Sequence, residues 1–251
     1  MSLGPDSFPE PRPDREITEQ DKKAVALERR QYFEALFGDF PRIMAVKEEL
    51  QAIWPDGGVI DFTAPKLNNI RVTASFGLSN LDMPRTQRIA SFRETFDGQE
   101  HTQEWTLKPF AEPMPTMPGR SGYGYELICL SRSEAIEGEV SPEARLIFQF
   151  VKAQLSSHRE NNLDRAWDKG ARVFSFEQSD APEQHYLLAP AWDLVPESFK
   201  LSSGAVCFMM MMRLTKDEVE YFKYAGANRM LEAFRTSGVL PICDDERASV
   251  I

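Results

Sequence analysis

The segment from Ala205 to Arg213 constrains the fold more than any other part of the chain. It reads Ala-Val-Cys-Phe-Met-Met-Met-Met-Arg, which is apolar at every position except the last. Successive side chains of a strand point to opposite faces, so an unbroken apolar run indicates a strand that is buried on both sides. We therefore predict a sheet with this strand in its middle and other elements over both faces. We interpret the four methionines as gap-filling core residues; a flexible binding surface is the alternative.

A second buried strand is predicted from Arg120 to Leu130, with the sequence RSGYGYELICL. Its two-residue period places Tyr123, Tyr125, Leu127 and Cys129 on one face and Gly124, Glu126, Ile128 and Leu130 on the other. Gly122 and Gly124 either allow another backbone to approach closely or supply a positive φ. A carboxylate among apolar neighbours is costly unless it is paired or hydrogen-bonded. We therefore expect Glu126 to have a fixed partner or to lie at the wet end of the strand.

The remaining periodicities predict helices and short strands. A helix is expected from Thr18 to Gly38, with an apolar stripe at Ala24, Leu27, Tyr32, Leu36 and Phe37. Two more helices are expected from Pro41 to about Ile53 and from Ser141 to about His158. Two further helical stretches follow the capping box Thr215–Glu218 and end at Gly238. Strands are expected at 59–63, 70–76, 171–177, 185–188 and 199–203. The first two of these strands form an antiparallel hairpin.

The segment 85–118 has a pattern of its own. Strand-like stretches at 88–96 and 102–107 predict an extra hairpin joined around Asp97-Gly98. Prolines follow at positions 109, 113, 115 and 118, and we expect them to exclude regular structure. Such a hairpin projects from the domain and is a surface that can tune the choice of partner.

Four motifs occur in an order that is similar to one protein family. They are Ser-Phe-Gly-Leu-Ser-Asn at 75–80, Ser-Gly-Tyr-Gly-Tyr-Glu-Leu at 121–127, Leu-Thr-Lys-Asp-Glu-Val-Glu at 214–220 and Asp-Glu-Arg-Ala-Ser-Val at 245–250. Together they resemble the suppressor-of-fused domain in its single-domain form, over roughly residues 40 to 251. The resemblance implies an α+β fold with a mixed, mainly antiparallel sheet flanked by helices. One domain is expected at 18–251, with the insertion at about 85–118 longer than the family pattern. The segment 1–17 is expected to be a flexible tail, because residues 1–15 contain four prolines, several charges and almost nothing apolar.

The resemblance also implies a function, namely a non-enzymatic protein-binding domain. In animals the family restrains a transcription factor by clasping a short peptide between two domains, and only the first of these is matched here, so the clasp does not carry over intact. Bacterial single-domain relatives resemble immunity proteins that bind and neutralise a cognate toxin. We therefore expect a protein partner that is neutralised or regulated, with a basic toxin domain as a candidate. A stand-alone regulator of a housekeeping protein is an alternative that the sequence does not separate from immunity.

The two glycine-rich motifs are the predicted partner site, because glycine permits close backbone approach and aromatic residues are typical interface anchors. The residues assigned to partner binding are Phe76, Leu78, Ser79, Asn80, Tyr123 and Tyr125. Tyr123 and Asn80 are expected to be partly exposed, so that an extended segment can add a strand there. The alternative is that these residues only pack the sheet. The residues assigned to the structural motif are Gly77, Gly122, Gly124, Glu126, Thr215, Glu218 and Arg247.

The sequence offers little for catalysis. His101, His158 and His185 lie in unrelated contexts, so we expect no metal site, and neither glycine motif matches a phosphate or dinucleotide loop. We expect no catalytic residues and no cofactor. The rival hypothesis is an enzyme whose pocket is formed by Tyr123, Tyr125, Glu126 and Arg247. That hypothesis requires an exposed Glu126 with a raised pKa.

Charge and cysteine usage restrict the surroundings of the protein. A net charge of −10 and a pI near 5.0 argue against nucleic acid or an anionic membrane as the partner, and favour a basic or neutral protein. The cysteines at 129, 207 and 243 have no metal-binding spacing and are interpreted as reduced thiols of a cytoplasmic protein. We expect no secretory leader, and the longest apolar run is too short to span a bilayer.

Overall fold

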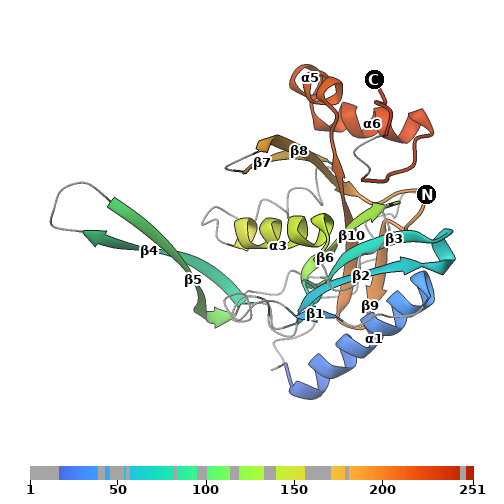
Figure 1. Cartoon of the computed structure of the whole chain (residues 1–251). Coiled ribbons are helices and arrows are strands. Elements are labelled where there is room, and N and C mark those ends of the chain that lie inside the picture. Colours follow the sequence, from blue (N-terminus) through green and yellow to red (C-terminus); the bar gives the residue numbers. More distant parts are fainter. Residues whose placement is uncertain are drawn as a thin grey trace.

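The structure is a computed structural model that describes residues 17–38, 43–45, 54, 57–81, 84–94, 101–113, 119–132, 140–155, 171–178, 181–243 and 247–251. Its helices are α1 (Glu19–Phe37), the 3-10 helix η2 (Pro65–Leu67), α3 (Pro142–Leu155), α5 (Lys216–Ala225) and α6 (Ala227–Ser237). Its strands are β1 (Met44–Ala45), β2 (Gly58–Ala64), β3 (Ile70–Phe76), β4 (Pro84–Glu94), β5 (His101–Pro113), β6 (Arg120–Ser131), β7 (Arg172–Gln178), β8 (Ala181–Pro190), β9 (Ser198–Leu201) and β10 (Gly204–Arg213) (Figure 1).

Eight of the described strands form one mixed sheet in the order β1-β2-β3-β6-β10-β8-β7, with β9 paired to β10. Every pairing in this sheet is antiparallel except β6 with β10, which is parallel. The predicted α+β class with a mainly antiparallel sheet is confirmed. So is the central position of the apolar strand at 205–213, which is β10.

Both faces of β10 are covered, as its sequence predicts. Alternate residues belong to two separate cores: Val206, Phe208, Met210 and Met212 to one, and Cys207, Met209 and Met211 to the other. Helices α1, α5 and α6 contribute to the first core and α3 to the second, and Figure 1 shows α3 across the sheet from α1. The four consecutive methionines are at most 2% exposed, so they pack the core and are no binding surface.

Helix α1 begins and ends where its sequence predicts. Thr18 and Asp21 form a reciprocal capping box, and the chain leaves the helix at Gly38 with a positive φ of 103°. The predicted apolar stripe is partly wrong, because Leu27 is 55% exposed. The buried residues instead recur every fourth position, at Val25, Arg29, Phe33 and Phe37. One member of this buried stripe is a cation.

The helix predicted from Pro41 to Ile53 is wrong at Met44–Ala45, which form strand β1. This short strand pairs antiparallel with Val59 and Gly58 at the start of β2. The approach is close, because a Cβ at Gly58 would lie 2.4 Å from the carbonyl oxygen of Met44. Backbone pairing with β2 therefore overrides the helical spacing of the side chains. The rest of that predicted helix lies outside the described residues, apart from Ile43.

The insertion contains the predicted hairpin, formed by β4 and β5. The strands pair in antiparallel register from Glu94 with His101 to Pro84 with Pro113, and the hairpin extends away from the body of the protein (Figure 1). The expected exclusion of regular structure by proline is wrong for Pro109 and Pro113, which lie within β5. In the described part of the chain β5 pairs with β4 alone, and proline is tolerated in a strand with an unpaired edge. Positions 97–98, 115 and 118 lie outside the described residues.

The C-terminal half follows its sequence signals closely. The hydroxyl of Ser141 accepts a hydrogen bond from the amide of Ala144 and begins α3, and Thr215 and Glu218 form the capping box of α5. Helix α6 ends at Gly238 with a φ of 69°. The predicted strands correspond to β7, β8 and β9. The tail at 1–16, most of the linker after α3 and the acidic positions 244–246 lie outside the described residues.

Candidate functional site

The motifs at 75–80 and 121–127 meet at the buried carboxylate of Glu126. Glu126 is fully buried, and its side chain binds the loop that follows β3. One oxygen accepts hydrogen bonds from the amides of Gly77 and Ser79, each at 3.0 Å, and from the hydroxyl of Ser79 at 2.6 Å. The other accepts from the hydroxyl of Ser75 at 2.7 Å and the amide of Leu78 at 3.2 Å. The expected fixed partner of Glu126 is therefore a whole loop, with three consecutive amides directed at one carboxylate.

A cation from α1 completes this cluster, and the sequence reasoning missed it. Arg29 is 1% exposed and donates to the hydroxyl of Ser79 at 3.0 Å and to Oδ1 of Asn80 at 2.6 Å. Its Nη1 lies 3.9 Å from an oxygen of Glu126, and its guanidinium lies 4.4 Å from the centre of the Phe76 ring. The only signal in the sequence is the position of Arg29, four residues from Val25 and Phe33 on the buried stripe of α1. We call Arg29, Ser75, Gly77 to Asn80 and Glu126 the carboxylate cluster.

The two glycines of β6 allow the loop to pack this closely. Gly122 has a φ of 55°, and a Cβ there would lie 2.3 Å from the carbonyl oxygen of Asn80. Gly124 has a φ of 76°, and its Cβ would lie 2.9 Å from the Arg120 side chain. Between them, the amide of Tyr123 donates to the carbonyl of Leu78 at 3.0 Å. Both expected reasons for glycine, close approach and positive φ, therefore apply at Gly122.

The predicted partner residues come together but are almost completely buried. Their exposed fractions are 5% for Phe76, 1% for Leu78, 0% for Ser79, 9% for Asn80, 3% for Tyr123 and 5% for Tyr125. The expectation that Tyr123 and Asn80 are partly exposed is therefore wrong. Burial also raises the pKa of the Tyr123 hydroxyl above its ordinary value. The sequence motif is a packing device in this structure, and its role in partner binding stays a prediction.

Arg247 belongs to a second cluster, at the end of β10. It donates to Oε1 of Glu218 at 2.6 Å and to the carbonyl of Arg213 at 2.7 Å, and its guanidinium lies over the ring of Phe234. The amide of Val250 also donates to Glu218. Burial raises the pKa of Glu218, but the hydrogen bond from Arg247 and the backbone amides outweigh it, so the pKa lies below its ordinary value. The structure thus ties the C-terminus to α5.

The structure, in the residues that it describes, does not contain the pocket of Tyr123, Tyr125, Glu126 and Arg247 that the enzyme hypothesis requires. That hypothesis needs Glu126 to be exposed in a pocket with Arg247, whereas Glu126 is sealed by the loop after β3 and Arg247 binds Glu218. The thiols of Cys129 and Cys207 are buried, and burial raises their pKa values, which suppresses the reactive thiolate. Among the described side chains, no three metal-ligating residues are grouped as a metal site.

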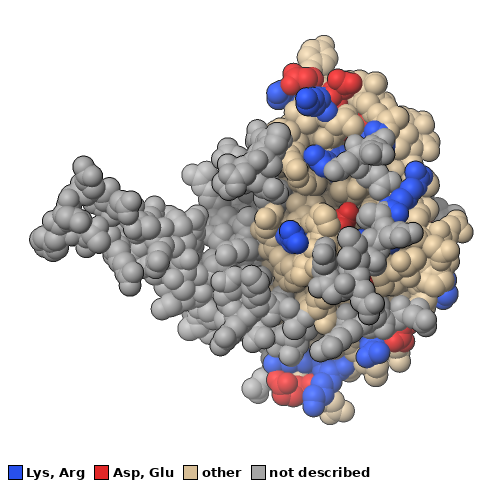
Figure 2. Space-filling model, in the orientation of Figure 1, with Lys and Arg blue, Asp and Glu red and all other residues tan. Residues whose placement is uncertain are grey.

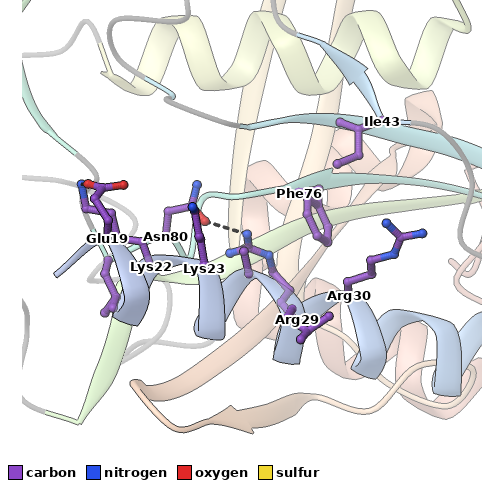
Figure 3. Close-up of a pocket in the computed structure, with 11 residues that line it drawn as sticks. Glu19, Lys22, Lys23, Arg29, Arg30, Ile43, Phe76 and Asn80 are labelled. Atoms are coloured by element: carbon purple, nitrogen blue, oxygen red, sulfur yellow. Dashed lines mark hydrogen bonds and ion pairs between the residues drawn. The ribbon is translucent and has the colours of Figure 1, made fainter. Parts of the chain in front are cut away.

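An accessible pocket lies directly beside the carboxylate cluster (Figure 3). It has a volume of about 350 Å³ and is lined by α1 on one side and by Ile43, Phe76, Asn80 and Leu81 on the other. Arg29 and Asn80 are thus shared between the carboxylate cluster and the pocket, and Phe76 borders both. This pocket is the part of the predicted partner site that a ligand can reach.

Comparison with known proteins bears on the fold. No protein-family model matches the sequence, and none of the curated proteins matches it. Among solved structures, the chain is similar to a protein from Neisseria gonorrhoeae FA 1090 described as a suppressor of fused protein homolog. The TM-score is 0.52 at 15% identity, over 92% of this chain and 98% of that one. The chain has a suppressor-of-fused-like fold.

Two further solved structures are matched with TM-scores below 0.5. They are Sufu in a Sufu–Fu complex, with a TM-score of 0.45 at 16% identity over 91% of both chains, and Drosophila Suppressor of Fused, with a TM-score of 0.46 at 16% identity. The chain spans half of the length of the Drosophila protein. At 15% identity, the likeness to the Neisseria gonorrhoeae homolog shows the fold and not the function. Within the described residues, no helix is long and apolar enough to cross a membrane.

Proposed function

We propose that this suppressor-of-fused-like protein is a non-enzymatic domain that binds a partner protein and neutralises or regulates it. The observation that carries the proposal is the β4–β5 hairpin. Among the described strands, β4 and β5 pair only with each other, and they extend from the body as a two-stranded ribbon. Such a ribbon is marginally stable by itself, and the outer edges of its strands present backbone groups that a partner strand can pair with.

The sealed carboxylate cluster supports the same proposal. The polar groups that an enzyme would direct at a substrate are used here to fix the loop at 77–80. That loop in turn holds Phe76 and Asn80 at the wall of the pocket. A rigid core beside an accessible surface is what a preorganised binding domain needs.

We further propose that the partner is a toxin domain that is basic overall, and that the protein acts as its immunity protein in the cytoplasm. The net charge of −10 supports a basic partner, because opposite net charges accelerate diffusional encounter. The suppressor-of-fused-like fold, which this chain shares with the Neisseria gonorrhoeae homolog over 98% of that chain, supports a protein-binding role. Regulation of a housekeeping protein is the alternative outcome of the test.

The test removes the hairpin without disturbing the sheet. Because Gln87 and Lys108 face each other in the register, residues 88–107 can be replaced by Asn-Gly, which closes a two-residue hairpin turn. The tagged full chain and the shortened chain are used to capture partners from the native cell, and binding of the purified partner to each is then measured by calorimetry. We expect an unchanged unfolding midpoint and an affinity lower by at least about tenfold for the shortened chain.

Two outcomes would contradict the proposal. Equal affinity of the shortened chain for the captured partner would exclude the hairpin as the binding surface. Failure of the full chain to capture any protein above a mock control would contradict the binding function itself. The immunity role is tested separately, by expressing the captured partner alone and together with this chain. Growth arrest that co-expression relieves supports immunity, and a partner without toxicity supports the housekeeping alternative.

A further inference from the structure

The wall of the pocket beside α1 is one continuous face of the helix. Its lining residues on α1, apart from Arg29, are Glu19, Lys22, Lys23, Ala26, Leu27 and Arg30. Their spacing of three, one, three, one and three positions places all six on one face over three turns. At 1.5 Å per residue, the eleven steps from Glu19 to Arg30 span about 16 Å. The pocket is therefore elongated along the helix, and its length matches about five residues of extended chain at 3.3 Å each.

After Glu19 at its start, this helical face has cations on both sides of two apolar residues. Lys22 and Lys23 lie toward the N-terminal end and Arg30 toward the C-terminal end, with Ala26 and Leu27 between them. Leu27 is 55% exposed, so its apolar side chain is accessible at the pocket. Figure 3 shows the Lys23 and Arg30 side chains along α1 beside the pocket, on either side of Arg29.

The opposite wall is apolar and firmly held. Ile43, Phe76 and Leu81 supply apolar surface, and Asn80 supplies an amide. Asn80 is bound by Arg29 at 2.6 Å, and the Phe76 ring lies under the same guanidinium. A ligand in the pocket therefore meets a wall that the carboxylate cluster has already ordered, which lowers the entropic cost of binding.

Lys22 and Arg30 each form an ion pair with a carboxylate of α1. Lys22 binds Glu19 at 2.6 Å and Arg30 binds Glu34 at 3.0 Å, and both pairs lie at the surface within α1. Exposed ion pairs of this kind contribute little to stability, so a carboxylate from another molecule can compete with them. Figure 2 shows basic and acidic side chains interspersed along this lower edge of the molecule. The exposed Lys23 adds positive charge beside Leu27.

We propose that this pocket binds a short extended segment of the partner protein that has an apolar side chain in its middle and carboxylates on both sides. The proposal rests on the proposed function and gives the partner a chemical description. The apolar side chain enters between Leu27 and the Phe76 wall, and the carboxylates pair with Lys22 and Lys23 at one end and Arg30 at the other. An acidic segment is compatible with a partner that is basic overall. The long-range attraction between the two proteins depends on their net charges, whereas the position at which the segment binds depends on the charges around the pocket.

A model peptide tests the pocket directly. The probe is fluorescein-labelled Gly-Glu-Glu-Leu-Glu-Glu, and its binding to the full chain is followed by fluorescence polarisation at low salt. One comparison peptide has lysine at every glutamate position and another has glycine in place of leucine. We expect the acidic probe to bind with a Kd below about 1 mM and both comparison peptides to bind at least about tenfold more weakly.

Matched variants locate the binding. Lys23→Glu reverses a charge at the pocket, and Lys223→Glu makes the same change at an exposed position of α5. We expect the first to weaken the probe about tenfold and the second to leave it unchanged, with equal unfolding midpoints for both. Leu27→Ser should weaken the probe as well. Equal effects of the two lysine variants, equal binding of the lysine peptide, or no binding of the acidic probe would each overturn the proposal.

The failure of this proposal is distinguishable from failure of the proposed function. If a captured partner binds Lys23→Glu as tightly as the wild type, the pocket is excluded and protein binding stands. If the acidic probe binds but no partner is captured, the pocket stands as a peptide site and the proposed function fails.

Discussion

Replacement of Glu126 by glutamine should destabilise the protein by about 3–5 kcal/mol. The carboxylate accepts five hydrogen bonds, from three amides and two hydroxyls. If the amide oxygen of glutamine takes the place of Oε1, the NH₂ group faces the amide of Leu78 and leaves that buried donor unpaired, at a cost of about 1–3 kcal/mol. The three retained bonds lose their charge assistance, which costs roughly 2 kcal/mol more in total.

The measurement is urea unfolding at neutral pH, followed by tryptophan fluorescence, with Glu220→Gln as the control. Glu220 is exposed on α5, and its loss should change the free energy of unfolding by less than about 0.5 kcal/mol. A double variant with Arg29→Met should be less destabilised than the sum of the single variants by about 1 kcal/mol, because each single change leaves a buried partner group behind. A cost below about 1 kcal/mol for Glu126→Gln would refute the assignment of this carboxylate as the organiser of the loop.

Three further predictions concern stability. Gly122→Ala should lower the free energy of unfolding in urea by about 2–3 kcal/mol, which is more than the cost of Gly124→Ala. The added Cβ at 122 meets a backbone carbonyl, whereas the added Cβ at 124 meets a movable side chain. Gly124→Val should cost on the order of 2 kcal/mol or more. Tyr123→Ala should lower the unfolding midpoint and cost about 3–5 kcal/mol, whereas an unchanged midpoint would place this ring at the surface. The pKa of Glu218 is lowered from 4.5 in the folded state, so its charge stabilises the protein above pH 4.5 and this contribution is lost as the pH falls through the folded-state pKa. The difference in stability between wild type and Glu218→Gln, measured from pH 7 to pH 3, should therefore shrink on acidification; a constant difference would contradict the pairing with Arg247.

Local signals were sufficient for much of the architecture. The apolar run at 205–213 predicted a central strand with two covered faces, and the capping residues Thr18, Ser141 and Thr215 marked where helices begin. These signals are read correctly because the interactions behind them lie within a few residues of sequence.

The errors arose where distant contacts decide. Met44–Ala45 form a strand because β2 lies beside them, and Pro109 lies in a strand because one edge of β5 is unpaired by the described strands. Glycine and aromatic residues mark tight packing and binding surfaces alike, so the sequence did not show that Tyr123 and Asn80 are buried. Arg29 was missed for a similar reason, because a cation on an apolar helical stripe is recognised only when its partner fifty residues later, Ser79, is known to lie against it.

The parallel pairing of β6 with β10 joins two parts of the sheet that are synthesised at different times. Strands β1, β2, β3 and β6 come from the first half of the chain, and β7 to β10 come from the second, so this one seam joins them. Tyr125 faces Cys207 across it, 82 positions later in the sequence. During synthesis from the N-terminus, β6 therefore emerges as an apolar edge whose neighbour has not yet been made. Until β10 is synthesised, β3 is the only described strand with which β6 can pair, and an apolar strand with one unpaired edge is prone to aggregation.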